Sequence, residues 1–163
     1  MTFTAGQKVR ASQLNALLLE PAEYVASSAG ITSLLTGGTS YAAIIETTGS
    51  VKIGAAFVAP ASGVVRIDWG LNIRANTAST TISVATSVST GATVGSGTSF
   101  SAASDNEAIN VAGTSLVIPT SRFRLVTGLT AGDTYNAWIV WKNNSSGTAD
   151  ANHPFIGVTP QQQ

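Results

Sequence analysis

A stretch of alternating apolar and polar residues at positions 63–76 constrains the fold more than any other part of the chain. In its sequence, GVVRIDWGLNIRAN, every second position is apolar: Val65, Ile67, Trp69, Leu71 and Ile73. Successive side chains of a β-strand point to opposite faces, so this spacing predicts a long strand with one apolar face. A helix would distribute the same residues around its circumference. We therefore expect Trp69 to lie in the core and the rest of the chain to cover this face.

Short strand patterns separated by turn sequences continue through the chain from residue 41. They cover residues 41–47, 51–58, 80–88, 108–111, 115–118, 122–126, 134–142 and 155–158. Residues 91–106 are nearly all Gly, Ser, Thr and Ala, which predicts a long surface loop with Phe100 as its anchor. About eight strands with frequent turns are typical of an all-β, antiparallel sandwich or barrel.

The first 40 residues lack this strand pattern and contain a helical one. Ser12 is placed to cap a short helix over residues 13–18, which Pro21 would end. The apolar side chains of this helix lie on one face and are Leu14, Leu17 and Leu18. A helix this short is not stable by itself, so the face is expected to pack on its own domain, a neighbouring subunit or a larger assembly.

These patterns divide the chain into two parts. Residues 1–40 are predicted to form an N-terminal arm, with the short helix followed by a linker over residues 24–40 that is rich in Ser, Thr and Gly. Residues 41–163 are predicted to form the β domain.

The strand predicted over residues 134–142 differs from the others because both of its faces are apolar. One face carries Tyr135, Ala137, Ile139 and Trp141, and the other carries Trp138 and Val140. One face of a sandwich strand belongs to the core, so the second face needs another cover. That cover is either a segment under the N-terminal arm or a symmetry-related copy of the chain, since aromatic residues concentrate in interface cores. The candidate interface residues are Trp138, Val140 and Trp141.

The composition argues against several classes of partner and of covalent chemistry. Charged residues are only 10% of the chain, against about 25% in a typical soluble domain. Eight Lys and Arg residues balance eight Asp and Glu residues, so no net field would attract nucleic acid or an anionic membrane surface. No apolar run of roughly 18 residues occurs, which predicts no membrane span. The absence of cysteine excludes disulfides and Cys-ligated zinc.

Side chains with metal-binding or catalytic chemistry are few. His153 is the only histidine and precedes Pro154, which favours a surface loop over a ligand or catalytic role. The run 105–107, Asp-Asn-Glu, carries oxygen ligands suited to Ca²⁺, but it lacks the spacing of an EF-hand loop and is better interpreted as a solvated loop. Residues 91–98 are Gly-rich but lack the Lys of a phosphate-binding P-loop.

The remaining acid–base chemistry is equally sparse. No Gly-x-Ser-x-Gly elbow occurs, and the many serines have only one histidine as a possible base. The carboxylates Asp68, Asp105, Asp133 and Asp150 fall in separate strands or turns, so a glycosidase-like pair would require the fold to bring two of them together. We therefore predict that the protein is not an enzyme and needs no metal or cofactor.

Three short motifs in the β region resemble a known family of domains. FVAPASGVVRI at 57–67, LTAGDTY at 129–135 and FIGV at 155–158 are similar to the segments of C1q and tumour-necrosis-factor type domains that lead into a core strand, precede the penultimate strand and close the fold. The resemblance covers roughly residues 41–160. It implies an antiparallel jelly-roll sandwich that assembles as a compact homotrimer.

The start of the chain resembles a different group of proteins. TFTAGQKVRASQLN at 2–15 is similar to the opening of many small virion and tail proteins of tailed bacteriophages. That resemblance implies a virion surface protein, assembled in the host cytoplasm and attached to capsid or tail proteins through its N-terminal arm. The candidate attachment residues are Phe3, Leu14, Leu17 and Leu18.

Two classes of function remain open at this point. The first is a structural accessory, a trimeric head that decorates the capsid or acts as a minor tail protein. The second is the receptor-binding head of a short fibre or spike, which would bind a host surface glycan or protein through loops such as 91–106. The short chain without a shaft favours the structural accessory.

Overall fold

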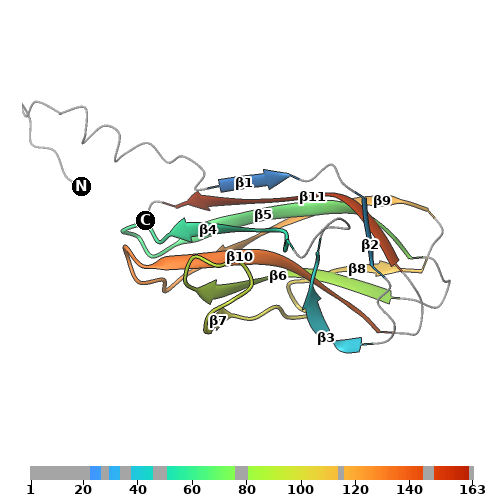
Figure 1. Ribbon diagram of the computed structural model, residues 1–163, viewed down its shortest axis with the longest axis horizontal. Helices are drawn as coiled ribbons and strands as arrows, with labels where there is room; N and C mark the ends of the chain where they lie inside the picture. Colours follow the sequence, from blue (N-terminus) through green and yellow to red (C-terminus); the bar gives the residue numbers. More distant parts are fainter. Residues whose placement is uncertain are drawn as a thin grey trace, which may run out of the picture.

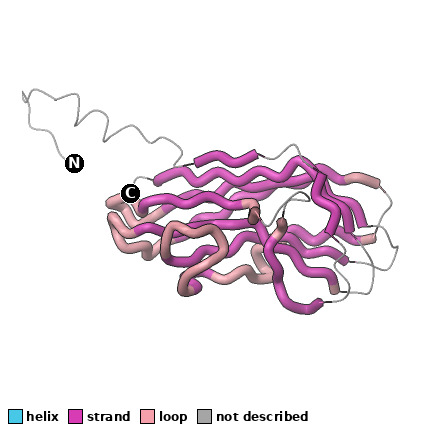
Figure 2. The backbone as a smooth tube through the Cα atoms, in the orientation of Figure 1, coloured by secondary structure: helices cyan, strands magenta, loops and turns pink. Residues whose placement is uncertain are grey.

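The computed structural model describes residues 23–26, 30–33, 38–45, 51–75, 81–113, 116–144 and 149–161, which form strands and turns (Figure 1, Figure 2). None of these residues lies in a helix, so this part of the chain offers no helix that could span a membrane. The helix predicted over residues 13–18 lies outside the described residues. The prediction of an all-β fold is confirmed.

The strands form two antiparallel sheets. Sheet A has the order β1-β11-β5-β9, with β2 also paired to β11. Its strands are β1 (Glu23–Ala26), β2 (Gly30–Ser33), β5 (Val65–Ala75), β9 (Ile118–Val126) and β11 (Ala149–Pro160). Sheet B has the order β3-β10-β6-β7, with β4 also paired to β10 and β8 to β6. Its strands are β3 (Gly38–Ala43), β4 (Gly54–Val58), β6 (Thr81–Thr90), β7 (Ser99–Ser101), β8 (Ile109–Ala112) and β10 (Thr134–Asn143).

Sheet A begins earlier in the chain than the sequence pattern predicts. β1 pairs with β11 from Glu23, opposite Val158, and β2 pairs with the first part of β11 from Gly30, opposite Asn152. The linker predicted over residues 24–40 therefore contains strand residues. These short strands are defined by main-chain hydrogen bonds to β11. Such bonds do not require apolar and polar side chains to alternate, so the sequence pattern did not reveal the two strands.

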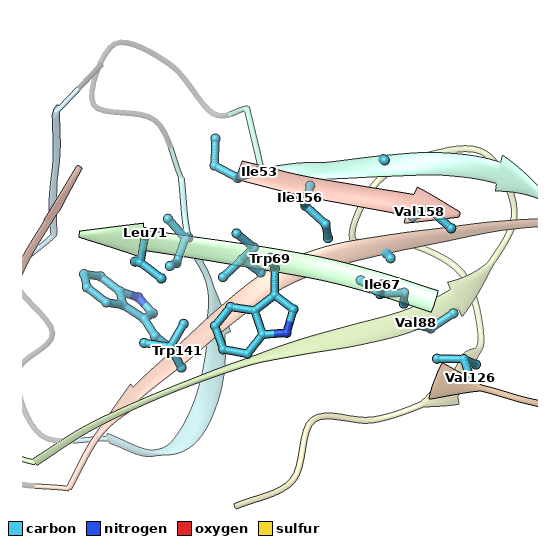
Figure 3. Close-up of a cluster of buried hydrophobic side chains, with 14 of the residues drawn as sticks. Ile53, Ile67, Trp69, Leu71, Val88, Val126, Trp141, Ile156 and Val158 are labelled. Carbon is cyan, nitrogen blue, oxygen red and sulfur yellow. The ribbon is translucent and has the colours of Figure 1, made fainter. Parts of the chain in front are cut away.

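β5 lies in the middle of sheet A, between β11 and β9, and it is the strand predicted from the alternating stretch. Trp69 is only 1% exposed, which confirms its predicted place in the core, whereas Arg66 is exposed. Figure 3 shows Trp69 and Leu71 of β5 and Trp141 of β10 directed into the same space. These residues belong to one cluster drawn from both sheets, so the two sheets enclose a single core as in a β-sandwich.

Two predicted strands are longer in the structure because main-chain pairing extends beyond the apolar pattern. β9 begins at Ile118, the last residue of the segment predicted at 115–118, and continues through a polar middle into the segment predicted at 122–126. The closing strand, predicted at 155–158, is β11 and begins at Ala149. A bulge interrupts its pairing with β5 between Asn152 and Phe155. His153 lies in this bulge with φ of 50°, so the predicted loop histidine is an exposed strand residue.

Candidate functional site

The described residues hold no cluster of metal ligands. Nowhere in this part of the chain do three His, Cys, Asp or Glu residues gather in a group that could hold a metal ion. Three of the four carboxylates considered above lie in ion pairs with arginine or lysine: Asp68 with Arg66, Asp105 with Lys142, and Asp150 with Arg74. Their charges are thus balanced locally by cations of the same chain.

The residues predicted as a subunit interface fall on opposite sides of sheet B. Trp141 points into the core, where it is 1% exposed, so it does not contribute to the outer surface of the chain. Val140 and Trp138 lie on the other face, in a second cluster with Ala85, Ala108, Ala103 and Tyr41. The second face of β10 does need a cover, as its sequence indicates. Within the described residues that cover comes from the same chain.

Part of this cover is the Gly-rich loop 91–98, which is held in place by one buried side chain. Asn136 of β10 is fully buried, and its Oδ1 accepts a hydrogen bond from the Gly95 amide at 2.9 Å. Its Nδ2 donates to the carbonyls of Gly91 at 2.9 Å and Ser96 at 3.2 Å. Val94 lies over Gly54 of β4, where any larger residue would collide with it. The loop therefore has a defined conformation on the outer face of sheet B.

The outer face of sheet A is different, because two large apolar side chains stand on it in the open. Phe123 and Leu125 of β9 are 53% and 55% exposed. Their partners across the ladder are Asp68 and Arg66 of β5, whose side chains also point away from the core. The Arg66 guanidinium lies 4.3 Å from the centre of the Phe123 ring. Phe123 and Leu125 lie on the edge strand of the sheet, a position where exposed apolar residues promote association.

A glycine in the middle of this face leaves room for an aromatic ring to pack against the sheet. The ring of Phe155 from β11 lies against Gly70 of β5, where an added Cβ would come within 2.6 Å of the ring. Two open hollows flank Phe155, with volumes of about 270 and 240 Å³. Ser121 lines both hollows, and His153 lines the larger one. The face thus combines protruding and recessed regions.

The charges on this face balance one another. Arg66 Nη2 lies 2.6 Å from Asp68 Oδ1, and Arg74 forms a second ion pair with Asp150 across β5 and β11. A face with paired charges can approach another copy of the chain without net repulsion, and the chain as a whole has equal numbers of acidic and basic residues. We define this surface as the sheet A face, made up of the outward-facing residues of β5, β9 and β11.

The sheet A face is not evident from the sequence. In the run RFRLV at 122–126, an alternation rule would place the apolar residues inward and the arginines outward. The register with β5 does the opposite, because Arg122 pairs with Trp69 and Arg124 with Ile67, both of which face the core. The four predicted attachment residues, Phe3, Leu14, Leu17 and Leu18, lie outside the described residues. No protein-family model matches the chain, and no curated protein matches it either.

Proposed function

We propose that this protein is a non-enzymatic structural accessory of a bacteriophage virion. It forms a homotrimeric jelly-roll head on the capsid or tail surface and is attached through its N-terminal arm. The observation that carries the assembly part of the proposal is the sheet A face, with its exposed Phe123 and Leu125 beside open hollows. The virion part rests on the resemblance of residues 2–15 to phage virion and tail proteins.

The strand order supports the jelly-roll part of the proposal. Eight strand positions can be lettered in chain order, with β1 and β2 as A, β3 and β4 as B, β5 as C, β6 as D, β7 and β8 as E, β9 as F, β10 as G and β11 as H. The sheets then read A-H-C-F and B-G-D-E. This is the order of an eight-stranded jelly roll, in which successive strands mostly alternate between the two sheets.

Two of the motifs that resemble C1q-type domains also lie together in space. The Ala59 amide donates to the Asp133 carbonyl and the Gly132 amide donates to the Ala59 carbonyl, each at 2.9 Å. The Leu129 amide donates to the carbonyl of Gly63, a residue with positive φ. The turn at 59–63 and the turn at 129–133 therefore form one unit at an end of the sandwich. The two motifs thus contact each other, and this contact supports treating the two sequence resemblances as parts of one structural feature.

The chain enters and leaves the sandwich at this same end. β1 begins at Glu23 opposite Val158, close to the end of β11 at Pro160, and Figure 1 shows these strand ends together. The main-chain amide of Gln161 donates a hydrogen bond to the carbonyl of Val64, beside the turn at 59–63. An arm that precedes β1 would therefore connect to this end, so the opposite end of the sandwich would face away from the particle.

Assembly through the sheet A face can be tested by labelling, because the chain has no cysteine. Ser121→Cys places a unique thiol between the two hollows, and Ala131→Cys places one on the exposed turn before β10. In a homotrimer joined by the sheet A face, the thiol of the Ser121→Cys variant would react with maleimide much more slowly than that of the Ala131→Cys variant. Light scattering on the unmodified protein should give three times the 16.5 kDa mass of one chain. A monomeric mass with equal labelling rates would refute the assembly.

Attachment is tested by removing residues 1–22, which leaves β1 and the other described strands intact. The shortened protein should keep its oligomeric mass but fail to rebind particles stripped of the native protein. The triple substitution of Leu14, Leu17 and Leu18 by Ser should reproduce the binding defect. Rebinding by both variants would place the attachment site on the β domain instead.

The receptor-binding alternative is favoured by one feature of the same face. The Phe155 ring lies beside Ser121, Asn72 and His153 in the larger hollow, an aromatic and polar combination that suits a sugar ring. A glycan site requires this surface to stay open, whereas assembly covers it. Fast labelling of the Ser121→Cys variant, slowed by a host glycan, would therefore favour the recognition head over the accessory.

A further inference from the structure

β9 carries the exposed part of the sheet A face, and two arginines extend from its other side, of which Arg124 is buried and Arg122 is exposed. Arg122 and Arg124 alternate with Phe123 and Leu125 along the strand, and Arg124 is only 7% exposed. Among the described residues β9 pairs with β5 alone, so its other edge has no strand partner. Inward-pointing charges are one way in which proteins protect such an edge.

Both arginines bind a single segment, residues 101–108, which we call the strap. Arg122 Nη1 donates to the carbonyl of Ala108 at 2.8 Å, and its Nη2 donates to the carbonyl of Asn106 at 3.3 Å. Arg124 Nη1 donates to Glu107 Oε2 at 2.6 Å, and its Nη2 donates to the Ser101 carbonyl at 3.3 Å. The free edge of β9 is thus restrained by side-chain bonds to the strap in place of a neighbouring strand.

The strap is bound to sheet B through its other acidic residue. Lys142 Nζ of β10 lies 2.6 and 2.7 Å from the two carboxylate oxygens of Asp105, and the Tyr41 hydroxyl donates to Oδ1 at 2.8 Å. The Ala103 amide donates to Ser87 Oγ of β6 at 3.2 Å. The hydrogen bonds from Lys142 and Tyr41 hold the pKa of the Asp105 carboxyl below its ordinary value, so this carboxyl is ionised at neutral pH. The acidic run predicted as a solvated loop is exposed at Asp105 and Asn106, and its carboxylates also connect the two sheets.

We propose that the strap is a clamp that positions β9 for assembly, with the Arg124–Glu107 pair fixing the edge strand that presents Phe123 and Leu125 to a second copy of the chain. This inference rests on the proposed assembly through the sheet A face. An edge strand paired on one side only is a region of low local stability. If β9 is already fixed before association, forming a subunit contact does not have to offset the conformational entropy lost by ordering this strand. Arg124, Asp105 and Glu107 are positioning residues, because none of them lies on the surface that meets the neighbour, whereas Arg122 lines the smaller hollow of that surface.

The test compares the neutral substitution Glu107→Gln with Asp133→Asn, which removes one negative charge from an exposed turn outside the strap. Sedimentation equilibrium measures association, and amide hydrogen exchange measures the local stability of β9. Glu107→Gln should weaken association roughly 5- to 150-fold, the usual range for coupling between separate sites, and should speed exchange in β9 more than in β5 or β10. Asp133→Asn should change neither quantity.

The outcomes separate this inference from the proposed function. A monomeric unmodified protein refutes the assembly and the clamp together. An oligomeric unmodified protein whose Glu107→Gln variant associates as tightly refutes the clamp and leaves the proposed function in place. Weakening without faster exchange in β9, or equal weakening by Asp133→Asn, also refutes the clamp. If Glu107→Gln does not fold, Asp105→Asn provides the test from the sheet B side of the strap, and there unchanged association with unchanged exchange in β9 refutes the clamp.

Discussion

Replacing Phe123 by Ala tests the most exposed aromatic group of the sheet A face. The side chain is 53% exposed in the chain, so roughly 100 Å² of apolar surface remains to be covered if a Phe presents about 200 Å². At about 25 cal/mol per Å², covering it contributes about 2.5 kcal/mol to each subunit contact. Its loss should weaken each contact roughly 70-fold, since about 1.36 kcal/mol corresponds to a tenfold change.

The same substitution should have little effect on the fold. Within the chain Phe123 loses mainly its contact with the Arg66 guanidinium at 4.3 Å, and such a contact contributes about 0.5–1 kcal/mol at an exposed site. Val58→Ala is a suitable control, because Val58 is equally exposed but lies on sheet B. Sedimentation equilibrium over a range of concentrations gives the association constants, and urea unfolding gives the stability of the fold.

Three results would contradict this reasoning. Unchanged association of Phe123→Ala would show that the sheet A face does not meet another copy of the chain. Equal weakening by Val58→Ala would show that general surface hydrophobicity, rather than a defined face, drives association. A large loss of stability in urea would mean that Phe123 belongs to the core, in contradiction to its exposure in the structure.

Three further predictions concern the fold itself. Trp69→Ala should lower the free energy of unfolding in urea by about 3–5 kcal/mol, while Arg66→Ala on the opposite face should change it far less, and equal effects would contradict the register of β5. Asn136→Ala should lower that free energy by about 1–3 kcal/mol by leaving the part-buried carbonyls of Gly91 and Ser96 and the Gly95 amide without this partner, and it should speed hydrogen exchange in loop 91–98. Slow exchange there would show that other contacts hold the loop. Lys142 and Tyr41 lower the pKa of Asp105, so its contribution to stability is present above the unfolded-state value of about 3.9 and is lost as pH falls through the folded-state pKa. Asp105→Asn should therefore destabilise the protein at pH 7, and this effect should shrink as the pH falls below about 3.9, as measured by thermal melting. An effect that does not change with pH would contradict this.

The sequence predicted strands correctly where apolar and polar residues alternate strictly. The stretch 63–76 indicates β5 and a buried Trp69, because a strand that is buried on one face only must alternate. The two-faced pattern of 134–142 indicates that β10 is covered on both sides. Neither pattern identifies what provides the second cover, because the residues that supply it, such as Val94 and Tyr41, are far away in the sequence and lie in segments without a periodic pattern.

The sequence by itself determined the all-β class, the central strand and the balance of acidic and basic residues. The tertiary structure decided which side chains remain exposed. The register between β5 and β9 turns Phe123 and Leu125 outward and directs Arg122 and Arg124 toward the strap, reversing what hydrophobicity alone would assign. A shift of one residue in that pairing would exchange the two faces. The register depends on main-chain hydrogen bonds between strands that lie far apart in the sequence. These bonds cannot be predicted from a local pattern of side chains.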